Sequence, residues 1–166
     1  MTFASIAPGA AIFLDANTLI YHFSSDPKHG PACTQLMQRI ERQDVAAFTS
    51  SDVLTDLAHR LMTLEAIQRF GWPATGIASR LRKNRTDITK LTRFRQALLD
   101  LPQSRIQVFP ITQALVGAAA FLSQQHALLT GDALVVAVMQ ANGLSDLASA
   151  DPDFDTVPGL RRYSPI

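Results

Sequence analysis

The chain has 166 residues, 47% of them hydrophobic and 17% charged, a balance that is typical of a folded protein and excludes an intrinsically disordered one. The formal net charge of +1 identifies no class of partner, and the one cysteine, Cys33, excludes an internal disulfide and a thiolate metal cluster. This length supports one substantial hydrophobic core, so we predict a single domain over residues 1–166.

The N-terminus lacks the basic start and the long apolar core of a secretion signal. No apolar stretch of the sequence is long enough to span a lipid bilayer. We therefore predict a cytoplasmic protein that does not insert into membranes.

Short apolar runs alternate with helical patterns along the chain. The apolar runs predict strands at 11–14, 45–49, 106–109 and 146–149, with a short edge strand at 162–163. Apolar residues at helical spacing predict helices that begin at Thr18, span 33–40, follow Ser50 or Ser51, and span 112–126 and 132–142. Strands that alternate with helices indicate an α/β fold with a parallel sheet covered on both faces.

Residues 64–100 fit this alternation less well. They contain a break around Trp72, a basic stretch, and a predicted helix that ends before Pro102. Seven of the fifteen basic residues lie in this region: Arg80, Arg82, Lys83, Arg85, Lys90, Arg93 and Arg95. We interpret residues 64–100 as a helical, basic insertion.

Two apolar runs, one near each end of the chain, lead into a carboxylate. Asp15 follows the run at 11–14, and Asp151 follows the run at 147–150. Because ligands of open α/β sheets bind at the carboxyl ends of the strands, both acids should lie in one cleft. Carboxylates that are close together repel each other and raise each other's pKa, so such a cluster usually needs a cation. The sequence therefore predicts a divalent-metal site.

Two further segments place an acid near the same edge of the sheet. Asp56 lies at the border of the apolar face of the helix that follows Ser50. Asp132 opens a helix that is apolar on nearly every side, so the start of that helix should lie near the core. Asp153 lies two residues after Asp151.

Each acid also has an ordinary structural interpretation. Asp15 could cap a helix, Asp56 could pair with Arg60 four residues later, and Asp132 could compensate a helix dipole. The acids after residue 150 could form a solvated turn. Four separate segments that all place an acid at the expected edge of the sheet favour a shared site.

Four stretches of the sequence resemble, in order and spacing, the PIN-domain nucleases, especially the VapC-like toxins of toxin–antitoxin systems. These stretches are residues 13–20, 50–57, 130–137 and 147–154. The resemblance implies a three-layer α/β/α sandwich with a central parallel sheet and a ribonuclease site that depends on Mg²⁺ or Mn²⁺. The second acid of the family is usually Glu, and Asp56 is one methylene shorter.

The resemblance also implies roles for individual residues. The implied catalytic acids are Asp15, Asp56, Asp132 and Asp151. The implied metal ligands are Asp15, Asp132, Asp151 and Asp153, with Asn17 and Ser149 as supporting neighbours. Oxygen ligands favour Mg²⁺ or Mn²⁺ over zinc, and a metal-activated water would attack the RNA phosphodiester without a Ser, Cys or His nucleophile.

The expected partners are RNA, a cognate antitoxin protein and a second copy of the chain. Two interpretations of the basic stretch remain open. It can be a solvated helix face, or an arm beside the acidic cleft in which Arg80, Arg82, Lys83 and Arg85 contact RNA phosphates. The region around Trp72 is our expected groove for an apolar segment of the antitoxin.

Two other functions remain open. The segment Asp15-Ala16-Asn17-Thr18 weakly resembles the first motif of haloacid-dehalogenase-like phosphatases, in which the first Asp is a covalent nucleophile. Asn17 is a poor general acid for that motif, and no Lys follows Lys90. The second alternative is a non-catalytic PIN-like module that only binds a partner.

Overall fold

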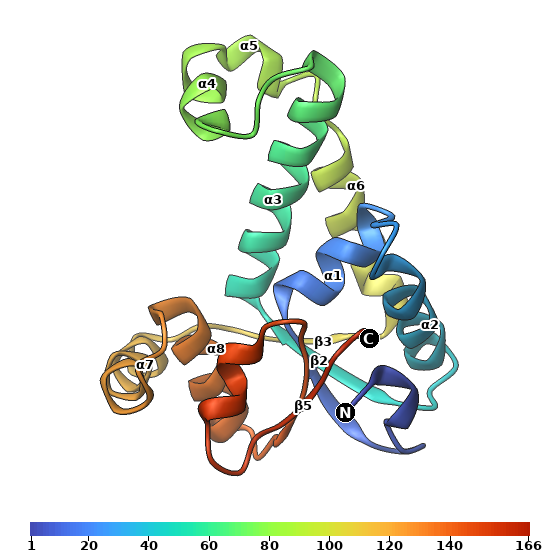
Figure 1. Ribbon diagram of the computed structural model, residues 1–166, viewed down its shortest axis with the longest axis vertical. Helices are drawn as coiled ribbons and strands as arrows, with labels where there is room; N and C mark the ends of the chain where they lie inside the picture. The colour runs from blue at the N-terminus through green and yellow to red at the C-terminus, as the bar shows by residue number, and fades with distance from the viewer.

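Five parallel strands form one sheet in the order β3–β2–β1–β4–β5 (Figure 1). The computed structural model describes residues 1–166. The strands are β1 (Ala11–Leu14), β2 (Ala46–Ser50), β3 (Gln107–Phe109), β4 (Asp146–Ala148) and β5 (Arg161–Tyr163). Phe13 pairs with Phe48 on one side and with Leu147 on the other, so the first apolar run lies at the centre of the sheet. The predicted strands are confirmed to within two residues at each end.

Helices cover both faces of the sheet. They are α1 (Ala16–Phe23), α2 (Gly30–Glu41), α7 (Gln113–His126) and α8 (Thr130–Ala141). The chain moves from β1 to β2 and β3 in one direction and returns to β4 on the other side of β1. Because parallel crossovers are right-handed, α1 and α2 lie on one face, whereas α7 and α8 lie on the other (Figure 1). The predicted α/β fold with three layers is confirmed.

Residues 51–100 form a helical arm that extends away from the sheet (Figure 1). Its helices are α3 (Ser51–Phe70), α4 (Ile77–Lys83), α5 (Arg85–Ile88) and α6 (Arg93–Asp100). The Ser50 hydroxyl caps α3 by accepting from the Val53 amide at 3.3 Å, as the sequence predicts. Gly71 ends α3 in the left-handed conformation, with φ 64°. The helix α6 returns beside α3, and α4 with α5 forms the far tip of the arm.

A buried carboxylate and a small apolar cluster hold the arm together. The Glu65 side chain of α3 is 6% exposed and accepts from the backbone amides of Thr92 and Arg93, each at 2.9 Å. Glu65 thus supplies the N-terminal cap that Thr92 does not provide for α6. A cluster of four buried residues, separate from the 32-residue main core, forms near the tip: Ala66, Ile77, Leu81 and Leu91.

Three short 3₁₀ helices complete the chain: η1 (Phe3–Ser5), η2 (Leu101–Ser104) and η3 (Pro152–Thr156). The sequence did not predict η3, which forms in the acidic segment after β4. The helix α8 begins two residues before the predicted start, so Asp132 lies in its first turn. None of the helices is both long enough and apolar enough to cross a membrane.

Candidate metal centre

Asp15 lies where β1 passes into α1. The chain leaves β1 for β2 on one side, whereas it leaves the neighbouring β4 for β5 on the other side, so the strand order switches between β1 and β4. Such a switch point is where ligands bind in open α/β sheets. The carboxylate is 9% exposed and accepts from the Ala16 amide at 2.6 Å, so Asp15 also caps α1. Burial raises the pKa of Asp15 to about 6, and the charges of Asp132 and Asp151 contribute to this increase. The helix-cap interpretation therefore applies to this residue, and its role in a metal site stays a prediction.

The Ser149 hydroxyl connects the two acids that end β1 and β4. It donates to Asp15 Oδ2 at 2.7 Å and accepts from the Asp151 amide at 3.0 Å. The Asn17 amide donates to the same Asp15 oxygen and, at 3.0 Å, to Ser149 Oγ. Asn17 Oδ1 accepts from the Ala150 amide at 3.0 Å. Asn17 and Ser149 thus fix the orientation of the Asp15 carboxylate, and their supporting role in a metal site stays a prediction.

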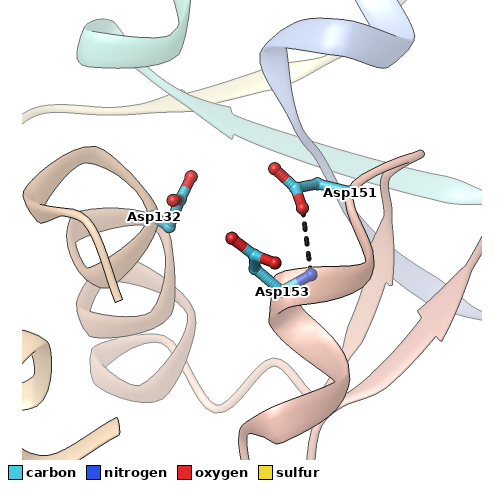
Figure 2. Close-up of side chains that lie close together, drawn as sticks. All are labelled: Asp132, Asp151 and Asp153. Carbon is cyan, nitrogen blue, oxygen red and sulfur yellow. Dashed lines mark hydrogen bonds between the residues drawn. The ribbon is translucent and has the colours of Figure 1, made fainter. Parts of the chain in front are cut away.

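Three carboxylates converge (Figure 2), and one of them belongs to Asp151, whose amide donates to Ser149 of this network. Asp132, Asp151 and Asp153 each offer an oxygen within 4.8 Å of the others. Asp132 comes from the first turn of α8, and the other two come from the start of η3. The Asp151 side chain accepts from the Asp153 amide at 2.9 Å, which caps η3 and turns both carboxylates toward Asp132 (Figure 2). Burial, Asp151 and Asp153 raise the pKa of Asp132.

Two of the predicted site residues lie outside this group of three. Asp15 is close enough for its pKa to respond to Asp132 and Asp151, but it lies behind them, within the Ser149 network. Asp56 is an exposed side chain in the second turn of α3. It forms no ion pair with Arg60, and its charge raises the pKa of Asp132. Asp56 is therefore near enough for its charge to affect Asp132, but it is not one of the three converging acids.

Arg162 is a residue that the sequence did not place near the site. Its guanidinium donates to both carboxylate oxygens of Asp155, at 2.8 and 2.7 Å, and to the Ser149 carbonyl at 3.1 Å. These bonds tie η3 to β4 and β5 and lower the pKa of Asp155. Asp155 is thereby paired and does not join the group of three. The only sequence signal for this role is that Arg162 lies in the predicted edge strand at 162–163.

The basic stretch does not lie beside the acids, so the expected position of the arm was wrong. Arg80, Arg82 and Lys83 lie in α4, and Arg85 lies in α5, at the far end of α3 from the sheet (Figure 1). The physical reason is that α3 continues without a break for 20 residues, or about 30 Å. Trp72 also lies at this tip, where its ring contacts Phe70 at 4.7 Å and Arg80 at 5.8 Å.

The group of three has the chemistry of a site for a hard divalent cation. All its donors are carboxylate oxygens, and Asp153 and Asp132 remain accessible to solvent. The network behind it presents a fourth carboxylate, Asp15, whose charge is unfavourable in its buried position. No basic side chain forms an ion pair with Asp132, Asp151 or Asp153. A cation would relieve this repulsion, and the donor set fits Mg²⁺ or Mn²⁺.

Solved structures that are similar to this one include proteins of toxin–antitoxin systems. VapC20 from Mycobacterium tuberculosis, a toxin that cleaves the sarcin-ricin loop, has a TM-score of 0.61 and 17% identity, covering 87% of this chain and 92% of that chain. VapBC2 from Rickettsia felis, bound to a promoter DNA fragment, has a TM-score of 0.59 and 16% identity, covering 93% and 98%. A toxin–antitoxin complex from Klebsiella pneumoniae has a TM-score of 0.55 and 18% identity, covering 93% and 98%.

No curated protein sequence matches this chain. At these low identities the structural similarities show a shared fold, and the fold is that of the VapC and FitB toxins. The sequence itself matches the PIN domain family over residues 12–160, which span all five carboxylates of the predicted site. The chain therefore belongs to the PIN-domain family, as its ordered acidic motifs predict.

Proposed function

We propose that this protein is a divalent-metal-dependent endoribonuclease and the toxin of a toxin–antitoxin pair. The observation that carries the proposal is the convergence of Asp132, Asp151 and Asp153 at the switch point of the sheet, in front of the buried Asp15. No other group of three or more His, Cys, Asp or Glu side chains is placed to hold a metal ion. Membership of a nuclease family and similarity to a toxin that cleaves RNA support the same conclusion.

The chain's own residues would hold the metal and position the substrate. Asp132, Asp151 and Asp153 would bind Mg²⁺ or Mn²⁺ directly, with Asp15 as an additional ligand and Asp56 acting directly or through water. The cation, when bound, would lower the pKa of a water molecule and balance the charge on the scissile phosphate. Ser149 and Asn17 hold the Asp15 carboxylate in one orientation. The exposed side of the group leaves room for a phosphodiester to approach.

The test is cleavage of total RNA by the purified protein with Mg²⁺ or Mn²⁺ and with EDTA. We expect cleavage with either metal and none with EDTA. Asp151→Asn keeps the side-chain shape but removes the charge of a ligand, so we expect a rate loss of about 10²-fold or more. Asp44→Asn is the matched control, because Asp44 pairs with Arg39 at the opposite end of β2 and should leave the rate unchanged. Cleavage at the wild-type rate by Asp151→Asn would remove this residue from the mechanism.

The toxin role has its own test in cells. Expression of this chain alone should slow growth, and co-expression of the adjacent small open reading frame should restore it. The similar structures include toxin–antitoxin complexes, which supports a protein inhibitor as partner. A basic side chain of that inhibitor could pair with the acidic group. Harmless expression of a protein that still cuts RNA would instead indicate a housekeeping nuclease.

We also propose that the protein forms a homodimer, and light scattering would test this by measuring its mass in solution.

The two alternative functions differ in their support. Membership of the PIN family leaves the phosphatase alternative without support, and the nearly buried Asp15 carboxylate accepts three hydrogen bonds, which makes it a poor covalent nucleophile. A non-catalytic binding module remains the alternative if the wild-type protein cuts no RNA with either metal.

A further inference from the structure

A polar groove runs between α1 and α3 from the metal centre toward the arm. Its first part is a pocket of about 310 Å³ that begins at Asn17, the residue that bonds Asp15 and Ser149. A second pocket, of about 550 Å³, continues the groove, because Ser24 and Gln68 line both. We call the combined feature the α1–α3 groove. A ligand that lies in it would have one end next to Asn17 and its hydrogen-bond partner Asp15.

Three side chains of the groove have unused binding capacity. Arg60 is exposed and forms no ion pair. Asp26 Oδ1 accepts from the backbone amides of Lys28 and His29, at 3.0 and 2.7 Å, while its other oxygen has no partner. The Tyr21 ring stacks on His29 with centroids 4.8 Å apart, which holds the ring in place at the edge of the pocket. The groove thus offers a cation, a carboxylate acceptor and an aromatic ring.

We propose that the α1–α3 groove binds the nucleotide next to the cleaved phosphate and prefers a base that carries an exocyclic amino group. This inference rests on the proposed ribonuclease function. The Tyr21 ring stacks with the base, and Arg60 pairs with a backbone phosphate, which are the contacts that single-stranded RNA commonly makes. The free oxygen of Asp26 accepts from the amino group of the base.

Cytosine and uracil differ at one edge of the ring, so the groove should bind them with different affinity. Cytosine presents the N4 amino group, a donor, to the free Asp26 oxygen. Uracil presents a carbonyl oxygen at the same position, and two acceptors repel each other. The groove should therefore favour cytosine over uracil at this nucleotide.

The experiment measures binding of fluorescent oligo(C) and oligo(U) to the Asp151→Asn protein with EDTA present, so that they are not degraded. We expect oligo(C) to bind about tenfold more tightly, as for one hydrogen bond to a charged group. Asp26→Asn, added to this protein, keeps Oδ1 for the two backbone amides and replaces the free acceptor with an amide donor. It should abolish or reverse the preference. An unchanged preference for oligo(C) in Asp26→Asn would overturn the proposal.

Two further substitutions keep the test decisive if Asp26→Asn destabilises the fold. Tyr21→Leu should weaken both oligonucleotides about tenfold or more by removing the stacking face, whereas Tyr21→Phe keeps the ring and should bind like the parent. Arg60→Gln should weaken both and reduce the slope of log affinity against log salt by about 0.7. Parent-like affinity in Tyr21→Leu and Arg60→Gln would also overturn the proposal. Unfolding midpoints establish that each variant is folded.

The cleavage assay on wild-type protein separates this inference from the proposed function. If the wild-type protein cuts RNA but the three groove substitutions leave affinity and base preference unchanged, the groove proposal fails alone. If the wild-type protein cuts no RNA but binds oligo(C) through Tyr21, Arg60 and Asp26, the groove is a nucleotide-binding site and the ribonuclease proposal fails.

Discussion

Ser149 is completely buried, and its hydroxyl holds Asp15 and Asp151 in a fixed relation. Each of these acids lies after the end of a strand, where the chain turns away from the sheet. The backbone conformation alone therefore does not fix the direction of either carboxylate. The hydroxyl satisfies a donor and an acceptor at once, which no apolar side chain of similar size could do. The geometry of the acidic group therefore depends on an uncharged side chain.

Ser149→Ala should weaken binding of Mg²⁺ or Mn²⁺ by about 10–100-fold, because the acids lose the neighbour that orients them. Isothermal titration calorimetry measures this affinity. Ser104→Ala is the matched control, since Ser104 is also buried but donates only to the Leu101 carbonyl, before β3. Equal metal affinity in the wild type and in Ser149→Ala would show that the network does not orient the ligands.

The position of Asp15 and Asp151 at one edge of the sheet could be predicted from the sequence, but the hydrogen bonds that connect them could not. Asp15 and Asp151 directly follow apolar runs that form parallel strands. Because parallel strands end at the same edge of a sheet, both acids lie at that edge. Ser149 and Asp15 are 134 positions apart, and their hydrogen bond depends on β1 and β4 being neighbours. Arg162 likewise reaches Asp155 only because β5 lies beside β4. Strand order, which the sequence pattern left open, decides both contacts.

At the scale of elements, η3 carries two of the three convergent acids and is held to the sheet by Arg162. The helix has only five residues, so it has little stability of its own. The guanidinium spans from Asp155, inside η3, to the carbonyl of Ser149, beyond the end of β4. Removing it should loosen the segment that presents Asp151 and Asp153.

Arg162→Gln should lower the free energy of unfolding at neutral pH by about 1 kcal/mol or less, since Asp155 is exposed to solvent. Arg162 lowers the pKa of Asp155, so the pair stabilises the fold above the unfolded-state pKa of about 3.9. This contribution disappears as the pH falls through the lowered pKa. Urea unfolding should show a difference between wild type and variant that narrows from about pH 5 to about pH 2.

Arg162→Gln should also slow RNA cleavage, and Arg161→Gln is the control for that effect. Arg161 pairs with Asp146 at 2.6 Å, at the start of β4 and away from η3. Arg161→Gln should leave the rate of RNA cleavage unchanged, whereas Arg162→Gln should reduce this rate. Equal cleavage by both variants would show that the Arg162 side chain does not support the acidic group.

The arm depends on Glu65 in a similar way. Because the carboxylate caps α6 from within α3, Glu65→Ala would leave the backbone amides of Thr92 and Arg93 without this cap, at a cost of about 1 kcal/mol. Amide hydrogens of α4 and α6 should then exchange faster than in the wild type, as mass spectrometry can measure. Glu65→Gln keeps one acceptor oxygen and should have a smaller effect. Unchanged exchange in Glu65→Ala would mean that packing alone holds α6.

At the scale of the whole molecule, we propose that the sheet and the arm form one domain, because α3 belongs to both. Its residues Leu57 and Leu61 lie in the main core, and Ala66 lies in the cluster near the tip. The basic composition of residues 64–100 could be predicted from the sequence. Its distance from the acids could not, because that distance depends on where α3 ends and on how α6 folds back.

The basic tip should bind RNA far from the cleaved bond, since α3 is about 30 Å long. Arg82, Lys83 and Arg85 are exposed and form no ion pairs. Replacing all three with Gln should weaken binding of long RNA. It should also reduce the slope of log affinity against log salt by about 0.7 for each phosphate that the tip no longer neutralises. Oligonucleotides of a few residues, which cannot reach the tip, should bind unchanged.

Replacing Arg42 and Arg105 with Gln is the control for general charge effects, because both are exposed residues outside the arm. An identical salt slope in the wild type and in the tip variant would assign the tip to a solvated helix face instead.

The helix α3 is continuous, so its length sets the direction in which the tip, formed by α4 and α5, points relative to Asp56. Each residue of an α-helix turns the chain by about 100° and advances it by about 1.5 Å. One residue inserted between Asp56 and Phe70 would therefore rotate the whole tip about the helix axis and pull Glu65 away from α6. Differences in length among relatives should accordingly fall at Gly71–Gly76 or at Asn84, where the chain leaves helical geometry, and not within Ser51–Phe70.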